Sequence, residues 1–328
     1  MTLGFNHILL TRPADEAWKF IFENLWTSFK KPIVPENLTA EVMKRDRNVS
    51  NIDLLLSSAA WDLWSQYLTS VPRTSQELIK FWNTTPGGKA VIILDGLSLR
   101  EVPWILEQAE KRGYCVNRSL ATGAEIPPDT TSFAKALGFN QRSSLENNEA
   151  GNSHFLQGAN TQSLYLNWRD CIGLVGNDPN VVLWHHWPDQ RVHDLDGPGL
   201  GLVRLSQEIF EGLTSDDFWG LVEKLTNGRT LVITSDHGYA ASGIFPDVTD
   251  KEQLDYLKNT YKSGRFVSGG RSKKQWIPPI DIDLETGNRA YSFVLGRRKW
   301  KNAGGYPTLT HGGLSLLEVV VPYIELVR

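Results

Sequence analysis

The sequence has 328 residues and a formal net charge of −3, with 41% hydrophobic and 22% charged residues. This is the composition of an ordinary globular protein that is long enough for a full core. It gives no whole-chain signal for binding to nucleic acid or to a membrane surface, and no apolar run reaches the length that spans a membrane. The two cysteines, Cys115 and Cys171, form neither a disulfide framework nor a zinc knuckle. We therefore expect a cytoplasmic protein with reduced thiols.

The first 87 residues are predicted to be mostly helical. Apolar side chains recur at helical spacing over 14–30, and further helices are expected near Glu36, over about 51–70 and from Thr74. A Thr-Thr-Pro-Gly-Gly run at 84–88 then marks a boundary. We interpret 1–87 as a helical N-terminal region and 88–328 as the main domain.

From Lys89 onward the pattern alternates between strands and helices, which favours a parallel sheet covered on both faces. A polar loop is expected over 140–163, and the segment 240–288, rich in Gly, Pro and Lys, is interpreted as an inserted cap. The expected fold class is therefore α/β, with a doubly wound sheet, a helical N-terminal region and a cap. The strands are expected at 89–94, 114–120, 181–184, 231–234 and 291–295.

Acidic and imidazole groups follow the ends of the expected strands, where open α/β sheets bind ligands. Aspartate and neutral histidine are ligands that suit Zn²⁺ and similar metals. Asp189 and His193 are four residues apart, so one helical turn brings both to one face. The alternative for each residue alone is a capping aspartate or a solvated loop histidine. The candidate metal ligands are Asp95, Asp189, His193, Asp236, His237 and His311.

A nucleophile is expected from the Pro-Pro-Asp-Thr-Thr-Ser run at 127–132, which precedes a helix. A hydroxyl there faces backbone N–H groups that also receive a phosphate, and a nearby metal would lower its pKa. The alternative is plain N-capping by Asp129, Thr130 or Thr131.

The order of these motifs resembles the alkaline phosphatase superfamily. The segment THGGLSLLEVVVP at 310–322 is similar to the PglZ domain, as is YSFVLGRR at 291–298. The resemblance covers about 88–328. It implies an alkaline-phosphatase-like sheet, and it matches Thr131 to the family's threonine at the helix start. It also implies partner proteins of a bacterial phage-defence system.

The resemblance further implies two divalent metal ions. Zn²⁺ fits the mixed nitrogen and oxygen ligands best, and Mn²⁺ or Mg²⁺ is the alternative at the more oxygen-rich site. One ion would be held by Asp189, His193 and His311. The other would be held by Asp95, Asp236, His237 and the Thr131 hydroxyl.

The function expected from these motifs is metal-dependent hydrolysis of a phosphoester, with a diester favoured over a monoester. Thr131 would attack phosphorus and form a phosphothreonine that water then releases. The alternatives are a phosphomonoesterase or phosphomutase of the same fold, and a non-catalytic metal-binding scaffold in a defence complex. A sulfatase is disfavoured because neither Cys115 nor Cys171 lies in a Cys-x-Pro-x-Arg context.

A basic segment suggests the substrate class. Between Lys262 and Lys301 there are ten Lys and Arg against three Asp and Glu. Basic groups interleaved with aromatic rings suit an oligonucleotide or a cyclic nucleotide. The alternative is a solvated basic face. The residues expected to bind substrate are Arg297, Arg298 and Lys299, with Lys273, Lys274, Lys301, Trp276 and Trp300 nearby.

Overall fold

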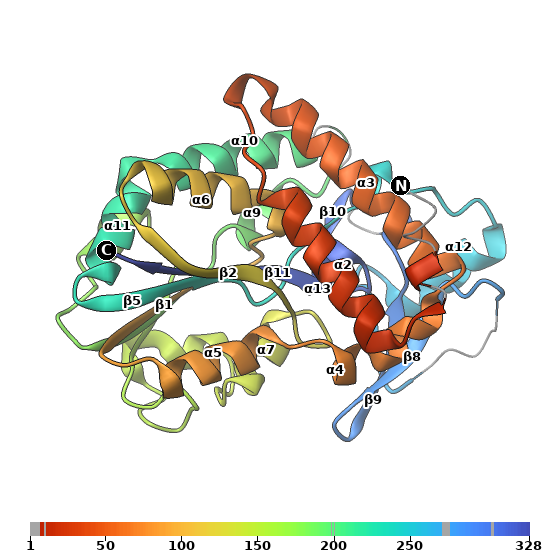
Figure 1. Cartoon of the computed structure of the whole chain (residues 1–328). Helices are drawn as coiled ribbons and strands as arrows, with labels where there is room; N and C mark the ends of the chain where they lie inside the picture. Colours follow the sequence, from red (N-terminus) through yellow and green to blue (C-terminus); the bar gives the residue numbers. More distant parts are fainter. Residues whose placement is uncertain (1–6, 10, 198, 200, 271–275, 303–304) are drawn as a thin grey trace.

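The computed structural model describes residues 7–9, 11–197, 199, 201–270, 276–302 and 305–328. Its centre is a six-stranded sheet in the order β2-β11-β5-β1-β4-β3 (Figure 1). β11 pairs antiparallel with both of its neighbours, and the other pairings are parallel. The strands are β1 (Gly88–Leu94), β2 (Cys115–Gly123), β3 (Asn160–Leu164), β4 (Asn180–His185), β5 (Arg229–Thr234) and β11 (Val320–Val327).

β1 lies in the middle of the sheet because both of its faces are apolar. Ala90, Ile92 and Leu94 enter one hydrophobic cluster, whereas Val91 and Ile93 enter another on the opposite face. All five side chains are completely buried. This alternation confirms the predicted doubly wound α/β class.

Helices cover both faces of the sheet, as Figure 1 shows. On one side lie α6 (Val102–Lys111), α10 (Gly201–Thr214) and α11 (Asp216–Thr226), and on the other α5 (Thr74–Thr84) and α7 (Thr130–Ala136). α10 was not predicted. Short helices α8 (Trp168–Ile172), α9 (Asp189–Asp194) and α13 (Leu316–Val319) sit in the connections.

The N-terminal helices share the core of the sheet. They are α2 (Ala14–Phe29), α3 (Leu38–Ser58) and α4 (Tyr67–Ser70). The ring centroids of Trp18 and Tyr67 are 5.2 Å apart, and the Tyr67 hydroxyl donates to the carbonyls of Ala124 and Val319. The helix expected over 51–70 is interrupted, because α3 ends at Ser58 and a 3₁₀ segment at 61–66 precedes α4.

The segment between β5 and β11 builds two smaller sheets beside the main one, β10-β6 and β7-β9-β8. It contains β6 (Ala240–Ala241), α12 (Lys251–Tyr261), β7 (Phe266–Ser268), β8 (Asp281–Thr286), β9 (Arg289–Val294) and β10 (Leu309–Thr310). The prediction that 291–295 returns to the main sheet is wrong. β9 instead forms a tight hairpin with β8 and also pairs with β7, and β11 takes the position beside β5.

Two further expectations concern loops. The stretch predicted as a polar loop over 140–163 contains a 3₁₀ segment, η4 (Arg142–Asn148), and the edge strand β3. Lys273 and Lys274 lie outside the described residues.

No helix among the described residues is both long and apolar enough to cross a membrane.

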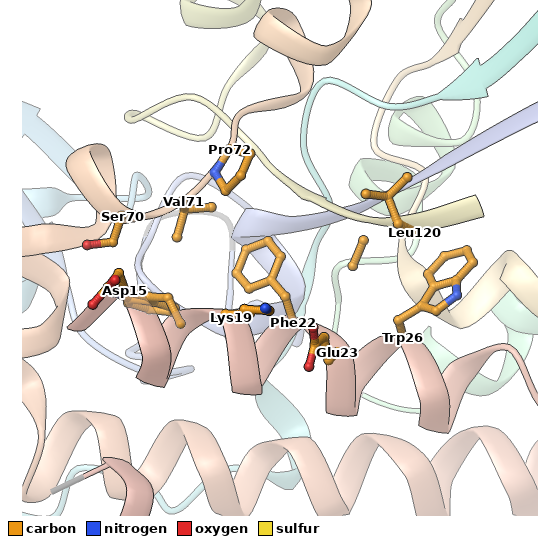
Figure 2. Close-up of a pocket in the computed structure, with 11 residues that line it drawn as sticks. Asp15, Lys19, Phe22, Glu23, Trp26, Ser70, Val71, Pro72 and Leu120 are labelled. Carbon is orange, nitrogen blue, oxygen red and sulfur yellow. The ribbon is translucent and has the colours of Figure 1, made fainter. Parts of the chain in front are cut away.

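An apolar hollow of about 460 Å³ lies between α2 and the edge strand β2 (Figure 2). Phe22 and Trp26 of α2 face Val71, Pro72 and Leu120 across it. None of the predicted site residues lines this hollow. It is therefore separate from the candidate site.

Candidate metal centre

Three neighbouring parallel strands bring the predicted carboxylates together. Asp95 follows β1, Asp236 follows β5, and Asp189 begins α9 just after β4. The backbone N–H of Asp189 donates to the Asp95 carbonyl at 2.8 Å. Gly96 has φ +74°, and a Cβ there would lie 3.1 Å from the Asp189 Cβ. Glycine therefore permits the close approach of the two ligand-bearing turns.

The first group of ligands is fully buried. The Nε2 atom of His237 lies 3.4 Å from an Asp95 carboxylate oxygen and 3.5 Å from one of Asp236. All three side chains are completely buried. An imidazole nitrogen and two carboxylates so close to one another can hold a cation.

The second group surrounds Asp189. Its carboxylate oxygens lie 3.3 Å from His193 Nε2, one turn along α9, and 3.5 Å from His311 Nε2. The His193 and His311 Nε2 atoms are 3.3 Å apart. His311 reaches the site from the turn after β10, and its ring stacks on that of His237 with centroids 4.2 Å apart. The structure therefore brings all six predicted ligand residues into one cluster.

Buried polar atoms without partners indicate that metal ions fit this cluster. Among the described residues, Asp189 Oδ1 and His237 Nε2 are buried and have no hydrogen-bond partner. Such atoms are costly unless something else satisfies them. Burial lowers the pKa of His311 to about 4, which keeps its imidazole neutral and able to ligate.

The structure brings Thr130, rather than Thr131, to this cluster. Thr130 Oγ1 lies 2.9 Å from an Asp236 carboxylate oxygen and 3.4 Å from both oxygens of Asp95. Thr131 is exposed and lines a hollow beside the cluster together with Ser132 and Lys135. Successive helical residues point about 100° apart, so only one of the two can face the carboxylates. The hydroxyl at the cluster is therefore that of Thr130, and not that of the predicted Thr131.

Arg142 is a site residue that the sequence did not reveal. Its guanidinium donates to the Asp95 carboxylate, and a quarter of the side chain is exposed. Burial lowers the pKa of Arg142, while the nearby Asp236 and Asp189 act to raise it. It comes from η4, inside the predicted loop, where no spacing or motif distinguishes it.

The predicted substrate-binding group of Arg297, Arg298 and Lys299 is wrong. Arg297 is completely buried and forms ion pairs with Asp46 and Asp53. Arg298 donates to the Leu295 carbonyl at 2.7 Å, and the largely buried Lys299 pairs with Asp247. These three cations satisfy groups of the protein itself.

This chain is similar to a known protein family and to a known bacterial protein. The family described as "BREX system PglZ alkaline phosphatase-like domain" matches residues 159–326, just over half of the chain. The "Alkaline phosphatase-like protein PglZ" of Bacillus cereus (strain H3081.97) is 28% identical over 127 residues. That stretch covers 36% of this chain but only 15% of the length of the Bacillus protein.

Solved structures with partial similarity include two enzymes. Murine ectonucleotide pyrophosphatase / phosphodiesterase 5 is 14% identical, with a TM-score of 0.43 over 73% of this chain and 87% of that one. Phosphonoacetate hydrolase from Sinorhizobium meliloti 1021, in complex with phosphonoacetate, is 12% identical, with a TM-score of 0.37 over 73% and 89%.

Proposed function

The chain belongs to the family of BREX system PglZ alkaline phosphatase-like domains, and from that premise we propose that it is a metal-dependent phosphoester hydrolase with Thr130 as its nucleophile. The observation that carries the proposal is the position of the Thr130 hydroxyl. It lies within hydrogen-bond reach of Asp236 and close to Asp95, inside the cluster of metal-ligating side chains. A hydroxyl placed among such groups is suited to nucleophilic attack.

The ligand set supports two divalent ions, with Zn²⁺ favoured and Mn²⁺ or Mg²⁺ as alternatives at the oxygen-rich position. When bound, such ions supply positive charge that polarises phosphoryl oxygens and lowers the pKa of a hydroxyl. Asp95, Asp236, His237 and Thr130 would hold one ion. Asp189, His193 and His311 would hold the other.

The side chains of this site suggest a two-step reaction. Thr130 Oγ1 forms a bond to phosphorus while the bond to the leaving oxygen breaks, and the proton of the Thr130 hydroxyl passes by way of Asp236 to the leaving oxygen. Asp236 accepts the hydrogen bond of the Thr130 hydroxyl and is placed to receive its proton. Water then attacks the phosphothreonine, releasing the phosphate product and restoring the hydroxyl.

Arg142 completes the proposed site. A guanidinium at the edge of the carboxylate cluster can form paired hydrogen bonds with two phosphoryl oxygens. We propose a phosphodiester of nucleotide type as the substrate, and an action together with partner proteins of a defence system; the BREX system in the family description supports this proposal. The alternatives are a phosphomonoesterase, a phosphomutase and a scaffold without turnover.

The test uses the protein loaded with Zn²⁺ or Mn²⁺ and two chromogenic esters, bis(p-nitrophenyl) phosphate and p-nitrophenyl phosphate. We expect faster hydrolysis of the diester. Thr130→Ala should lower kcat by at least a thousandfold, because the covalent route is lost, and the neighbouring control Thr131→Ala should keep most of the rate. Near-normal turnover by Thr130→Ala would rule out the covalent route. An absence of turnover of either ester by the loaded protein would favour the scaffold.

A further inference from the structure

A second hollow, of about 480 Å³, lies between α7 and the small sheet of β7, β8 and β9. α7 contributes Thr131, Ser132 and Lys135 to its lining, and the strands contribute Phe266, Arg289 and Tyr291. In Figure 1 the β8–β9 hairpin projects from the end of the molecule opposite the C-terminus. None of these six residues belongs to the metal-ligand cluster.

The hollow borders the candidate site on two sides. Thr131 in its wall is the neighbour of Thr130, whose hydroxyl faces Asp236. On the other side, Phe266 packs against the turn that carries His311, since a Cβ on Gly312 would lie 3.1 Å from the Phe266 ring. The hollow is therefore near enough to Thr130 for a substrate held there to reach it.

Aromatic rings form one part of the wall. The ring centroids of Phe266 and Tyr291 are 6.1 Å apart at an interplanar angle of 65°. Both side chains are partly exposed, and among the described residues the Tyr291 hydroxyl has no hydrogen-bond partner. An exposed ring at the rim of a hollow can stack on a nucleobase, which has a π-face whatever its sequence.

Two cations of the wall remain available to a ligand. Lys135 and Arg289 are exposed and form no ion pair with any residue that the structure describes. Two carboxylates also line the hollow: Glu125 pairs with Arg73, and Asp129 keeps its charge while it accepts from the Ser132 N–H at 2.7 Å, so the two cations exceed the uncompensated carboxylate by one charge. The hollow therefore offers unpaired positive charge to an anion.

We infer that this hollow binds a nucleoside and the adjoining phosphate of a nucleic-acid strand whose scissile phosphate lies at Thr130. The inference rests on the proposed phosphodiesterase function. Tyr291 stacks on the base, while Arg289 and Lys135 hold the next phosphate along the strand. The selectivity for nucleotides is thereby assigned to α7 and the cap strands and not to Arg297, Arg298 and Lys299.

The first experiment compares two esters with the same leaving group, thymidine 5′-(p-nitrophenyl phosphate) and methyl p-nitrophenyl phosphate. Only the nucleoside differs, so the ratio of their kcat/KM values reports what the hollow contributes. We expect a ratio above ten for the wild type, a fall of at least fivefold in Tyr291→Ala, and recovery of most of the ratio in Tyr291→Phe, which keeps the ring. A wild-type ratio near one, or an unchanged ratio in Tyr291→Ala, would overturn the inference while leaving the hydrolase proposal intact.

The second experiment measures the binding of fluorescently labelled (dT)₁₀ to the metal-free protein, and so does not depend on turnover. Arg289→Glu should raise Kd at least fivefold and flatten its dependence on salt, because a phosphate contact is lost. The control is Lys80→Glu, which makes the same charge change at an exposed site on α5. If neither ester is hydrolysed but Arg289→Glu weakens binding selectively, the hydrolase proposal fails and the binding site stands. Equal Kd values for Arg289→Glu and Lys80→Glu would overturn the binding site.

Discussion

Arg142 is the one strong cation in direct contact with the candidate ligand carboxylates among the residues that the structure describes. It comes from η4 and contacts the Asp95 carboxylate. Its partial exposure leaves donors free for a substrate. The side chain can therefore move its hydrogen bonds from Asp95 to phosphoryl oxygens when a phosphoester binds.

We predict that Arg142→Ala lowers kcat/KM for a chromogenic diester by about 10²–10³, the usual cost of removing a donor to a developing oxyanion. The kcat/KM of Arg142→Lys should lie between those of the wild type and Arg142→Ala, because lysine keeps the charge but cannot form the paired hydrogen bonds. The control is Arg169→Ala, which removes an exposed arginine of α8. Metal content is measured in parallel. If Arg142→Ala loses metal in proportion to activity, the residue positions Asp95 and does not contact the phosphate.

At the residue scale, the sequence predicts which acidic and imidazole side chains cluster better than it predicts which hydroxyl joins them. Asp95 and Asp236 each end a buried parallel strand, and adjacent parallel strands must end at one edge. Thr130 and Thr131 carry the same hydroxyl, and the choice between them depends on where the helix begins. Asp129 sets that point by accepting the Ser132 N–H, and nothing in the local sequence favours it over its neighbours as the cap.

At the scale of elements, a buried network of ion pairs fastens α3 to the site region. Asp46 of α3 pairs with Arg100 and Arg297, and Asp53 pairs with Arg297. Arg100 also donates to the carbonyl of Tyr239, two residues after His237. Burial raises the pKa of Asp53 to about 6 although Arg297 acts to lower it. The helical N-terminal region is therefore a structural support of the turns that carry the ligands.

We predict that Arg297→Ala lowers the free energy of unfolding by about 3–5 kcal/mol, because it leaves the buried Asp53 carboxylate without its cationic partner and Asp46 with Arg100 alone. Denaturant unfolding measures this change. Lys301→Ala, at an exposed position close in sequence, should stay within about 0.5 kcal/mol of the wild type. A stable Arg297→Ala variant that loses only oligonucleotide turnover would contradict the structural role and restore the substrate role.

The distant partners of Arg297 explain why the sequence alone suggests an exposed basic patch. Asp46 and Asp53 lie 251 and 244 residues away, so the local run of Arg and Lys looks like a surface patch. The prediction of β9 as a strand of the main sheet fails for a similar reason. β9 has the apolar character of a central strand, but its hairpin with β8 forms locally, whereas β11 reaches its position beside β5 from much further along the chain.

At the scale of the whole molecule, the candidate ligands tie distant segments together. They come from the ends of β1 and β5, from α9, and from the turn after β10. In the sequence these ligands extend from Asp95 to His311. Without a cation, Asp95, Asp189 and Asp236 are like charges within one small, largely buried cluster, offset in part by Arg142 and the imidazoles. Metal ions should therefore stabilise the folded chain, because they bind the unfolded chain far more weakly.

We predict that free Zn²⁺ at about a hundred times its Kd raises the free energy of unfolding by about 2.7 kcal/mol, as expected for a ligand that binds only the native state. Elemental analysis of the wild type should give up to two equivalents, and the double variant Asp236→Ala, His237→Ala should lose at least one of them together with much of the Zn²⁺-dependent stabilisation. Asp255→Ala, which removes an exposed aspartate of α12, controls for the loss of a negative charge. Unchanged metal content in the double variant would reject the assigned ligands. A wild-type unfolding transition that does not respond to Zn²⁺ or to a chelator would show that the cluster holds no ion, because ions that each join separate segments of the chain cannot bind without stabilising the fold.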